Sequence, residues 1–214
     1  MSWDSLYTDD FWIRWYNRTP LKITLDWINL LKETKAKNIF DMGCGLGRHT
    51  VILAESGFNV TACDTSSIAR KITEKELKNR NLHAEVINID IKDMPFSNNY
   101  FDAILSIGVL EHGTSTEIKR AIDEIFRILS LGGRTLASFC PRERWIFKDK
   151  TEQDMIEDNT FKSFGPEQTV HHLVDEKELE ELFNKFIIHS ISMQKEKSKE
   201  IRAQELFISA QKSK

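Results

Sequence analysis

The sequence is poor in the residues that mark fibrous, disulfide-linked or membrane-spanning chains. Its 214 residues include only 9 glycines and 4 prolines, which excludes a collagen-like or low-complexity protein. The cysteines Cys44, Cys63 and Cys140 are odd in number and scattered, so we expect reduced thiols and neither a disulfide framework nor a metal site. No apolar run approaches the roughly 18 residues that a membrane-spanning helix needs. The N-terminus is acidic and lacks the apolar segment of a secretory signal, so we expect a cytoplasmic protein without a membrane partner.

An excess of charge of either sign is also missing. The chain has 30 Lys and Arg against 33 Asp and Glu, a net charge of −3. This balance argues against a nucleic-acid partner, which would need a local basic patch. Hydrophobic residues make up 40% of the chain, enough for one sizeable core, so we expect a single domain over residues 1–214.

Strand-like and helix-like segments alternate through residues 38–140. Short apolar strands are predicted at 38–42, 59–63, 84–89, 101–107 and 134–140, and helices at 48–56, 67–80 and after Thr114. This alternation is typical of a doubly wound α/β fold, whose parallel sheet is covered on both faces. Two last strands, at 186–191 and 201–209, are separated only by a short charged turn, so we expect an antiparallel hairpin.

The most informative segment is a glycine-rich loop between the first strand and the helix that follows it. It reads D-M-G-C-G-L-G-R over residues 41–48, at the sheet edge where open α/β folds bind ligands. A dinucleotide fingerprint would need its third glycine at Arg48, and no Gly-Lys-Ser/Thr of a phosphate-binding loop is present. The acidic Asp41 would repel a phosphate and suit a cation. The loop therefore indicates a ligand that carries an amino group.

Two further carboxylates follow the next two strands. Asp64 ends the second strand, where an acid can accept both hydroxyls of a ribose. Asp90 and Ile91 follow the third strand, where a carboxylate can accept from an exocyclic amine while its apolar neighbour packs on a base. Together with Asp41, these residues indicate an aminoacyl nucleoside without phosphates.

These segments resemble, in sequence and in order, the class I S-adenosylmethionine-dependent methyltransferases, and in particular the "type 11" small-molecule group. The matching segments are FDMGCGLG (40–47), VTACDTS (60–66), NIDIKDMPF (88–96), FDAILSIGVLEH (101–112) and RILSLGGRTLAS (127–138). The resemblance implies a Rossmann-like, mostly parallel seven-stranded sheet that ends in an antiparallel hairpin. It also implies that S-adenosylmethionine is the cofactor.

The resemblance carries roles onto individual positions. Asp41 and the Gly43–Gly47 backbone would hold the methionine end, Asp64 the ribose, and Asp90 with Ile91 the adenine. The expected cofactor-binding residues are Asp41, Gly43, Cys44, Gly45, Gly47, Asp64, Thr65, Asp90, Ile91, Ile107 and Trp12. Trp12 belongs to an aromatic helical cap within residues 1–37, which either packs over the sheet edge or forms a lid across the sulfonium.

The acceptor side is defined by fewer residues. His112 follows the fourth strand and is either catalytic or a polar residue of the turn before the next helix. Residues 141–172 fall where the resemblance places acceptor-site insertions or lids. Within them, Trp145 is either an acceptor-site wall or a packing residue, and His171 is a further substrate candidate. No Cys or acid cluster completes a ligand set around His171, so we expect no metal.

Methyl transfer from a sulfonium needs alignment and exclusion of water, and a general base only for a protonated acceptor. We expect transfer to a small-molecule nucleophile. The fourth strand lacks both the Asn/Asp-Pro-Pro-Tyr/Phe segment of base-amino methyltransferases and a Pro-Cys nucleophile. An RNA or protein methyltransferase, or a catalytically silent S-adenosylmethionine-binding protein, stays open as an alternative.

Overall fold

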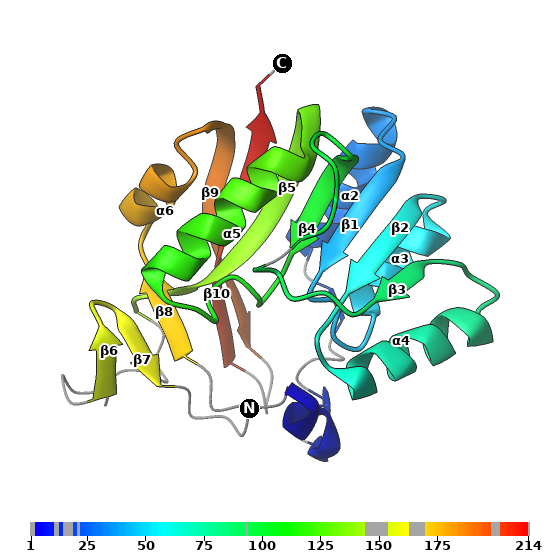
Figure 1. Cartoon of the computed structure of the whole chain (residues 1–214), viewed down its shortest axis with the longest axis horizontal. Helices are drawn as coiled ribbons and strands as arrows, with labels where there is room; N and C mark the ends of the chain where they lie inside the picture. Colours follow the sequence, from blue (N-terminus) through cyan, green and yellow to red (C-terminus); the bar gives the residue numbers. More distant parts are fainter. Residues whose placement is uncertain are drawn as a thin grey trace.

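The computed structural model describes residues 3–10, 13–14, 19–20, 22–92, 94–143, 154–162, 170–197 and 202–213. In these residues a twisted sheet lies between helices on its two faces (Figure 1). The strands are β1 (Asn38–Met42), β2 (Asn59–Cys63), β3 (Glu85–Ile87), β4 (Phe101–Ser106), β5 (Leu129–Pro141), β6 (Met155–Glu157), β7 (Thr160–Lys162), β8 (Val170–Val174), β9 (Phe186–Lys197) and β10 (Arg202–Lys212).

The helices are the 3-10 helix η1 (Trp3–Thr8) and the α-helices α2 (Lys22–Glu33), α3 (Arg48–Glu55), α4 (Ser67–Asn79), α5 (Ser115–Ile128) and α6 (Glu176–Leu182). The capping box expected at Thr114 is present, since its side chain accepts from the Glu117 N–H and Glu117 accepts from the Thr114 N–H. In the part of the chain that the structure describes, no helix combines the length and the apolar character that crossing a bilayer needs.

Among the described residues, seven strands form the main sheet in the order β3-β2-β1-β4-β5-β10-β9. Strands β1 to β5 run parallel to their neighbours, and β10 runs antiparallel to both β5 and β9. The predicted doubly wound sheet with a final hairpin is therefore confirmed. The strand order reverses between β1 and β4, so the loops that follow these strands diverge and leave room for a ligand at their carboxyl ends.

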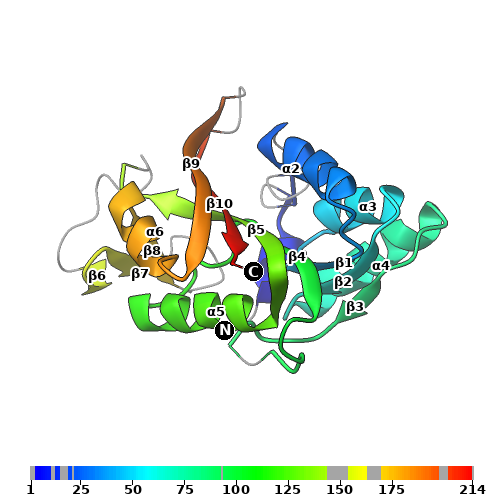
Figure 2. The same ribbon diagram turned by 90° about the horizontal axis from the view of Figure 1, so that it is seen from above.

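Successive residues of the parallel strands pack on opposite faces of the sheet. Ile39 of β1 belongs to the apolar cluster that contains Trp27 of α2 and Leu53 of α3. Its neighbour Phe40 belongs to the cluster that contains Ile122 of α5 and Leu179 of α6. Figure 2 shows α2 and α3 on one side of the strands and α5 on the other. Burial on both faces explains why these strands are apolar nearly throughout.

Four strands differ markedly in length from those expected. β3 covers only Glu85–Ile87, because it lies at the sheet edge and pairs with β2 alone. β5 begins at Leu129, which already pairs with Phe101 before the register shifts. The arms of the final hairpin are longer than predicted, since β9 and β10 stay paired as far as Lys197 and Arg202.

A small three-stranded extension grows from the C-terminal end of β5. Cys140 and Pro141 pair in parallel with Leu173 and Val174 of β8, which pairs antiparallel with β7, and β7 pairs with β6. These strands fall mostly within residues 141–172, where no regular element was expected. Strands of three residues are too short to display an alternating pattern. That this region serves the acceptor site stays a prediction.

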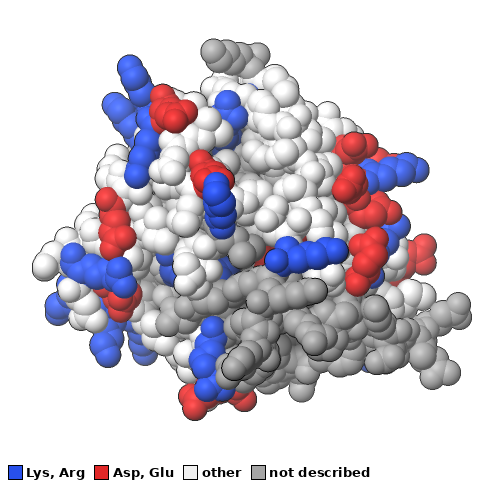
Figure 3. All heavy atoms as spheres, turned by 180° about the vertical axis from the view of Figure 1, so that it is seen from behind, with Lys and Arg blue, Asp and Glu red and all other residues white. Residues whose placement is uncertain are grey.

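Acidic and basic side chains are interspersed on the surface. On the face seen in Figure 3, the described Lys and Arg side chains lie among Asp and Glu side chains and do not gather into one basic area. Several charged side chains of the described residues form ion pairs, as Arg80 does with both Glu55 and Glu76. This distribution agrees with the nearly balanced charge of the sequence.

Lys212, close to the end of β10, ties the last turn of α5 to the sheet. Its buried ammonium donates to Asn99 Oδ1 and the Phe126 carbonyl, each at 2.7 Å, and to the Leu129 carbonyl at 2.9 Å. We expect Lys212→Met to lower the free energy of unfolding by about 1–3 kcal/mol, because buried carbonyls lose their donor. Urea unfolding measures this loss. Lys177→Met, at an exposed position, is the control, and an equal effect of the two variants would contradict the assigned role.

Candidate functional site

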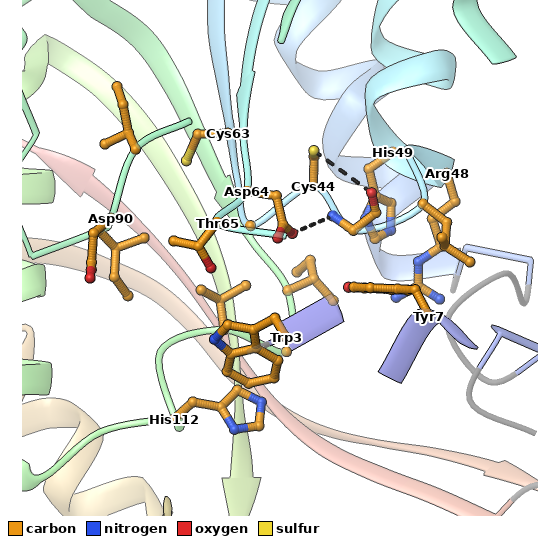
Figure 4. Close-up of a pocket in the computed structure, with 18 of the residues that line it drawn as sticks. Trp3, Tyr7, Cys44, Arg48, His49, Cys63, Asp64, Thr65, Asp90 and His112 are labelled. Carbon is orange, nitrogen blue, oxygen red and sulfur yellow. Dashed lines mark hydrogen bonds between the residues drawn. The ribbon is translucent and has the colours of Figure 1, made fainter. Parts of the chain in front are cut away.

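A cavity of about 370 Å³ lies at the carboxyl ends of β1, β2 and β4, where the strand order reverses. Its walls come from the glycine loop, from residues 64–65 after β2, from 89–92 after β3 and from 107–109 and His112 after β4. Helix η1 adds a further wall with Trp3 and Tyr7 (Figure 4). Small-molecule sites have volumes of about 300–1,000 Å³, so this cavity suits a ligand of nucleoside size.

The glycine loop adopts a backbone that side chains would prevent. Gly43 has φ 73°, and a Cβ atom there would lie 2.3 Å from Val109 Cγ2. Gly45 has φ 53°, and a Cβ atom there would lie 3.2 Å from the hydroxyl oxygen of Tyr7. Both positions therefore need the left-handed freedom and the small size of glycine. As a result, the loop backbone itself forms part of the cavity wall.

Asp64 joins the glycine loop to the start of α4. Its carboxylate accepts from the Gly45 N–H at 2.9 Å and from the Ser66 N–H at 2.8 Å. Burial raises the pKa of this carboxyl, although the two backbone donors and the charge of Arg70 oppose the rise. A carboxylate has about four acceptor positions, so Asp64 can still receive hydroxyl donors from a ligand in the cavity.

Asp41 lies beneath the loop rather than in the cavity wall. Its side chain is 2% exposed and accepts from the Thr50 hydroxyl of α3 at 2.6 Å. Burial raises the pKa of Asp41 to about 6, against the opposing effects of the Thr50 hydrogen bond and the positive charge of Arg48. Asp41 therefore acts on the cavity through its charge and by supporting the loop.

Charged groups of opposite sign lie at different ends of the cavity. Figure 4 places Asp90 on one side and Arg48 on the other, with Asp64 between them. Arg48 is also the first residue of α3, whose N-terminal dipole adds positive potential there. Lys92 lines the cavity near Asp90, but its ammonium is paired with Glu117 at 2.6 Å. The wall thus offers an acidic end and a basic end.

Three aromatic rings from three elements meet beside the cavity. The His112 ring lies 4.8 Å from the Trp3 ring and 4.3 Å from the His171 ring, centroid to centroid, and both contacts are edge-to-face. The His172 N–H donates to the Glu111 carbonyl at 2.8 Å and so holds β8 against the loop after β4. The extension of the sheet thereby brings His171 to His112, which lines the cavity.

Most of the site residues predicted from the sequence meet in this cavity. Those that line it are Gly43, Cys44, Gly45, Asp64, Thr65, Asp90, Ile91, Ile107 and His112. Asp41 and His171 lie behind the lining residues, and Gly47 caps α3 with its Cα facing Thr73. Trp12 and Trp145 lie outside the described residues, so their roles stay predictions.

Several lining residues were not predicted from the sequence. They are Trp3, Tyr7, Arg48, His49, Cys63, Ile89, Lys92, Gly108 and Val109. Most of them are next to a predicted residue in the chain. A prediction that assigned every residue of these loops to the site would therefore have included them. Trp3 and Tyr7 carry no such signal, because only the packing of η1 brings them to the cavity.

In the ranges that the structure covers, no three His, Cys, Asp or Glu side chains are grouped so as to hold a metal ion. His172 is instead held between two protein partners, with Nδ1 2.6 Å from the Thr160 hydroxyl and Nε2 2.7 Å from Glu178 Oε1. This buried side chain links β8 to β7 and α6, which is a structural role. The three cysteines are buried and carry free thiols.

Known proteins match the part of the chain that builds the cavity. Residues 40–137 match the family model described as a methyltransferase domain. A probable tRNA methyltransferase 9B of Mus musculus is 34% identical over 99 residues, which is 46% of this chain and 20% of that protein. The ubiquinone/menaquinone biosynthesis C-methyltransferase UbiE of Zymomonas mobilis is 29% identical over 126 residues, 56% of this chain and 49% of that protein. The matches thus span between a fifth and a half of these relatives' length.

Solved structures match nearly the whole fold. A protein from Methanosarcina mazei described as a SAM-dependent methyltransferase has a TM-score of 0.77 at 23% identity, covering 92% of this chain and 99% of that one. Magnesium protoporphyrin IX methyltransferase from Synechocystis has a TM-score of 0.71 at 15% identity, covering 98% of this chain and 96% of that one. Both structures are under 25% identical to this chain, so they show its fold. The sequence match, which includes the glycine loop, Asp64 and Asp90, makes residues 40–137 similar to a methyltransferase domain.

Proposed function

We propose that this chain binds S-adenosylmethionine in the cavity and transfers its methyl group to a small-molecule nucleophile. The observation that carries the proposal is Asp64, whose carboxylate lines the cavity while two backbone N–H groups fix its orientation. A carboxylate in this position, at the end of the second strand, suits the two hydroxyls of a ribose. The glycine loop beside it leaves the close approach that such a ligand needs.

The opposite charges at the two ends support one orientation of the cofactor. Asp90 and Ile91 would hold the adenine, with the carboxylate accepting from its amine. Arg48 and the N-terminus of α3 would hold the carboxylate of the methionine part, since both favour negative charge. The ring faces of Trp3 and Tyr7 would attract the positive sulfonium.

When bound, S-adenosylmethionine would supply a methyl group that is already activated on its sulfur. The chain's own residues then align the acceptor with that methyl group and exclude water. A neutral acceptor that attacks through an O–H, N–H or S–H group must also lose a proton. His112 lines the cavity and is the residue that we assign to accept it, with His171 packed against its ring.

Asp64→Ala is expected to weaken the binding of adenosylhomocysteine by about 1–3 kcal/mol, because the ligand's hydroxyls lose their acceptor. Isothermal titration calorimetry measures the loss. Asp102 is a matched control, since it accepts from the Lys37 and Asn38 N–H groups at 2.8 and 3.0 Å but lies at the opposite end of β4 from the cavity. Asp102→Ala should leave the affinity unchanged. Equal affinities for all three proteins would refute the ribose contact.

His112→Gln is expected to lower turnover by about 10²–10⁴-fold for an acceptor that must lose a proton, the usual contribution of a general base. Affinity for adenosylhomocysteine should stay within a factor of about three, because the assigned role involves the acceptor and not the cofactor. His189→Gln, on the exposed side of β9, is the control. Unchanged turnover in His112→Gln would remove this residue from the reaction.

The class of acceptor is tested by transfer of a labelled methyl group to three fractions of a cell extract. We expect label in the small-molecule fraction, because the chain has 30 Lys and Arg against 33 Asp and Glu and so carries no overall basic excess for RNA. Relatives of both kinds occur, since UbiE acts in quinone biosynthesis and methyltransferase 9B is described as acting on tRNA. Label confined to RNA or protein would overturn the proposed acceptor while leaving the cofactor in place.

A further inference from the structure

The side chain of Asp4 ties helix η1 to the start of α4. Asp4 accepts from the Ser66 hydroxyl, from the Ser67 hydroxyl at 3.2 Å and from the Ile68 N–H at 3.2 Å. Ser66 is the N-cap of α4, and its side chain accepts from the Ala69 N–H. Asp4, from a distant part of the chain, is the acceptor for a further N–H group of this helix end. We call this set of hydrogen bonds, made by Asp4 with Ser66, Ser67 and Ile68, the clasp.

The clasp holds two cavity-lining side chains in place. Trp3 and Tyr7 lie on either side of Asp4 in η1 and both line the cavity. Leu6 and Tyr7 are buried against Leu46 of the glycine loop and against α4. The Tyr7 hydroxyl comes close to Gly45 in the same loop. Helix η1 therefore covers the cavity beside the loop that forms its floor.

The clasp also meets the residue that carries the proposed function. The Ser66 N–H donates to Asp64 Oδ1 at 2.8 Å, while the Ser66 hydroxyl donates to Asp4. One residue thus supports both the carboxylate proposed for the ribose and the attachment of η1. The hydrogen bond from Ser66 is also the main reason that the pKa of Asp4 is lowered, so Asp4 stays charged at neutral pH.

A 3-10 helix of six residues has little stability of its own. Whether η1 lies over the cavity or away from it therefore depends on the clasp and on the small apolar cluster around Leu6. We propose that η1 is the gate of the cofactor cavity and that Asp4 is the positioning residue that holds the gate closed. This proposal rests on the proposed function, because the ligand behind the gate is the cofactor.

The test is the kinetics of adenosylhomocysteine binding, followed by stopped-flow tryptophan fluorescence. Asp4→Ala should speed release at least tenfold and should also speed association, because the same clasp closes the cavity in the free protein. Asp4→Asn keeps an acceptor oxygen without the charge and should give intermediate rates. Ser67→Ala removes one donor and should act in the same direction with a smaller effect. Asp10→Ala, at an exposed carboxylate nearby, should match the wild type.

The outcomes separate a gate from other roles. Unchanged release in Asp4→Ala would overturn the proposal, and so would faster release without faster association, which indicates a contact that stabilises only the filled cavity. Circular dichroism establishes that each variant is folded. Hydrogen exchange of the η1 amides in the ligand-free protein should be faster in Asp4→Ala. Hydrogen exchange needs no ligand, so it tests the clasp independently of the proposed function. Failure of the wild type to bind adenosylhomocysteine would refute the proposed function alone.

Discussion

Replacing Gly43 with alanine should lower the affinity for adenosylhomocysteine about tenfold to a hundredfold, because forcing an extra methyl group into packed surroundings costs about 1–3 kcal/mol. A methyl group at this position would lie 2.3 Å from Val109 Cγ2, so the loop or Val109 must move, and both form the cavity wall. The φ of 73° adds strain that only glycine avoids. Calorimetry with adenosylhomocysteine measures the loss.

Gly57→Ala is a control that introduces the backbone strain of a positive φ without disturbing the cavity wall. Gly57 has a φ of 84°, but a Cβ atom there would meet nothing within 4 Å. This control should lose stability, of the order of 1 kcal/mol for a left-handed alanine, and keep its affinity. In the double variant Gly43→Ala/Val109→Ala, removal of the valine methyl groups should restore part of the binding. Normal binding by Gly43→Ala would exclude the loop from the site.

The second large effect concerns the dependence of stability on pH through Asp41. Its pKa is raised to about 6 in the folded protein from 3.8, so folding favours the protonated form. The raised pKa contributes to the free energy of unfolding, and this contribution is fully present below about pH 4. It is lost as the pH rises through 6, which lowers the free energy of unfolding by about 3 kcal/mol. Asp41→Asn cannot ionise. Its stability relative to the wild type should therefore improve by about 3 kcal/mol between about pH 3.5 and 7.5.

Urea unfolding at a series of pH values tests this change. The quantity that decides is how the difference in free energy of unfolding between Asp41→Asn and the wild type varies between low and neutral pH. The amide also alters hydrogen bonding at Thr50, but that contribution is the same at every pH. Asp10→Asn, at an exposed position, is the control and should differ from the wild type by a constant amount. A constant difference for Asp41→Asn as well would contradict the raised pKa. Ionised Asp41 is thus costly to stability while its charge favours a cationic ligand, a conflict that is common at binding sites.

The parts of the fold that could be predicted are those for which the residue pattern within a single segment indicates where that segment lies. Ile39 and Phe40 face opposite sides of the sheet, and both must be apolar for that reason. Asp64 and Asp90 follow strands whose carboxyl ends meet at one edge, so their convergence on a cavity follows from the topology. The types and positions of these residues indicated an aminoacyl nucleoside as the ligand. The family resemblance then indicated that this nucleoside is S-adenosylmethionine.

The features that were missed depend on contacts between distant segments. Nothing near Trp3 or Tyr7 in the sequence indicates that Asp4 will reach the start of α4 and carry them to the cavity. The strands β6 and β7 are too short to show a period, and only the pairing of β6 with β7 and of β7 with β8 defines them. The aromatic pattern of the N-terminal region indicated either a packed cap or a lid at Trp12, which lies outside the described residues and stays a prediction. The described aromatic wall is formed by Trp3 and Tyr7.

The position of β10 has a consequence for how the chain reaches its native state. This strand is inserted between β5, which precedes it by many residues, and β9. Until residues 202–212 have been synthesised, the long edge of β5 has no permanent partner, and Lys212 is not available to satisfy the end of α5. Such an open edge invites pairing with other chains. Nascent or truncated forms that stop before this strand should therefore depend on chaperones, even though every residue of the cavity has already been made.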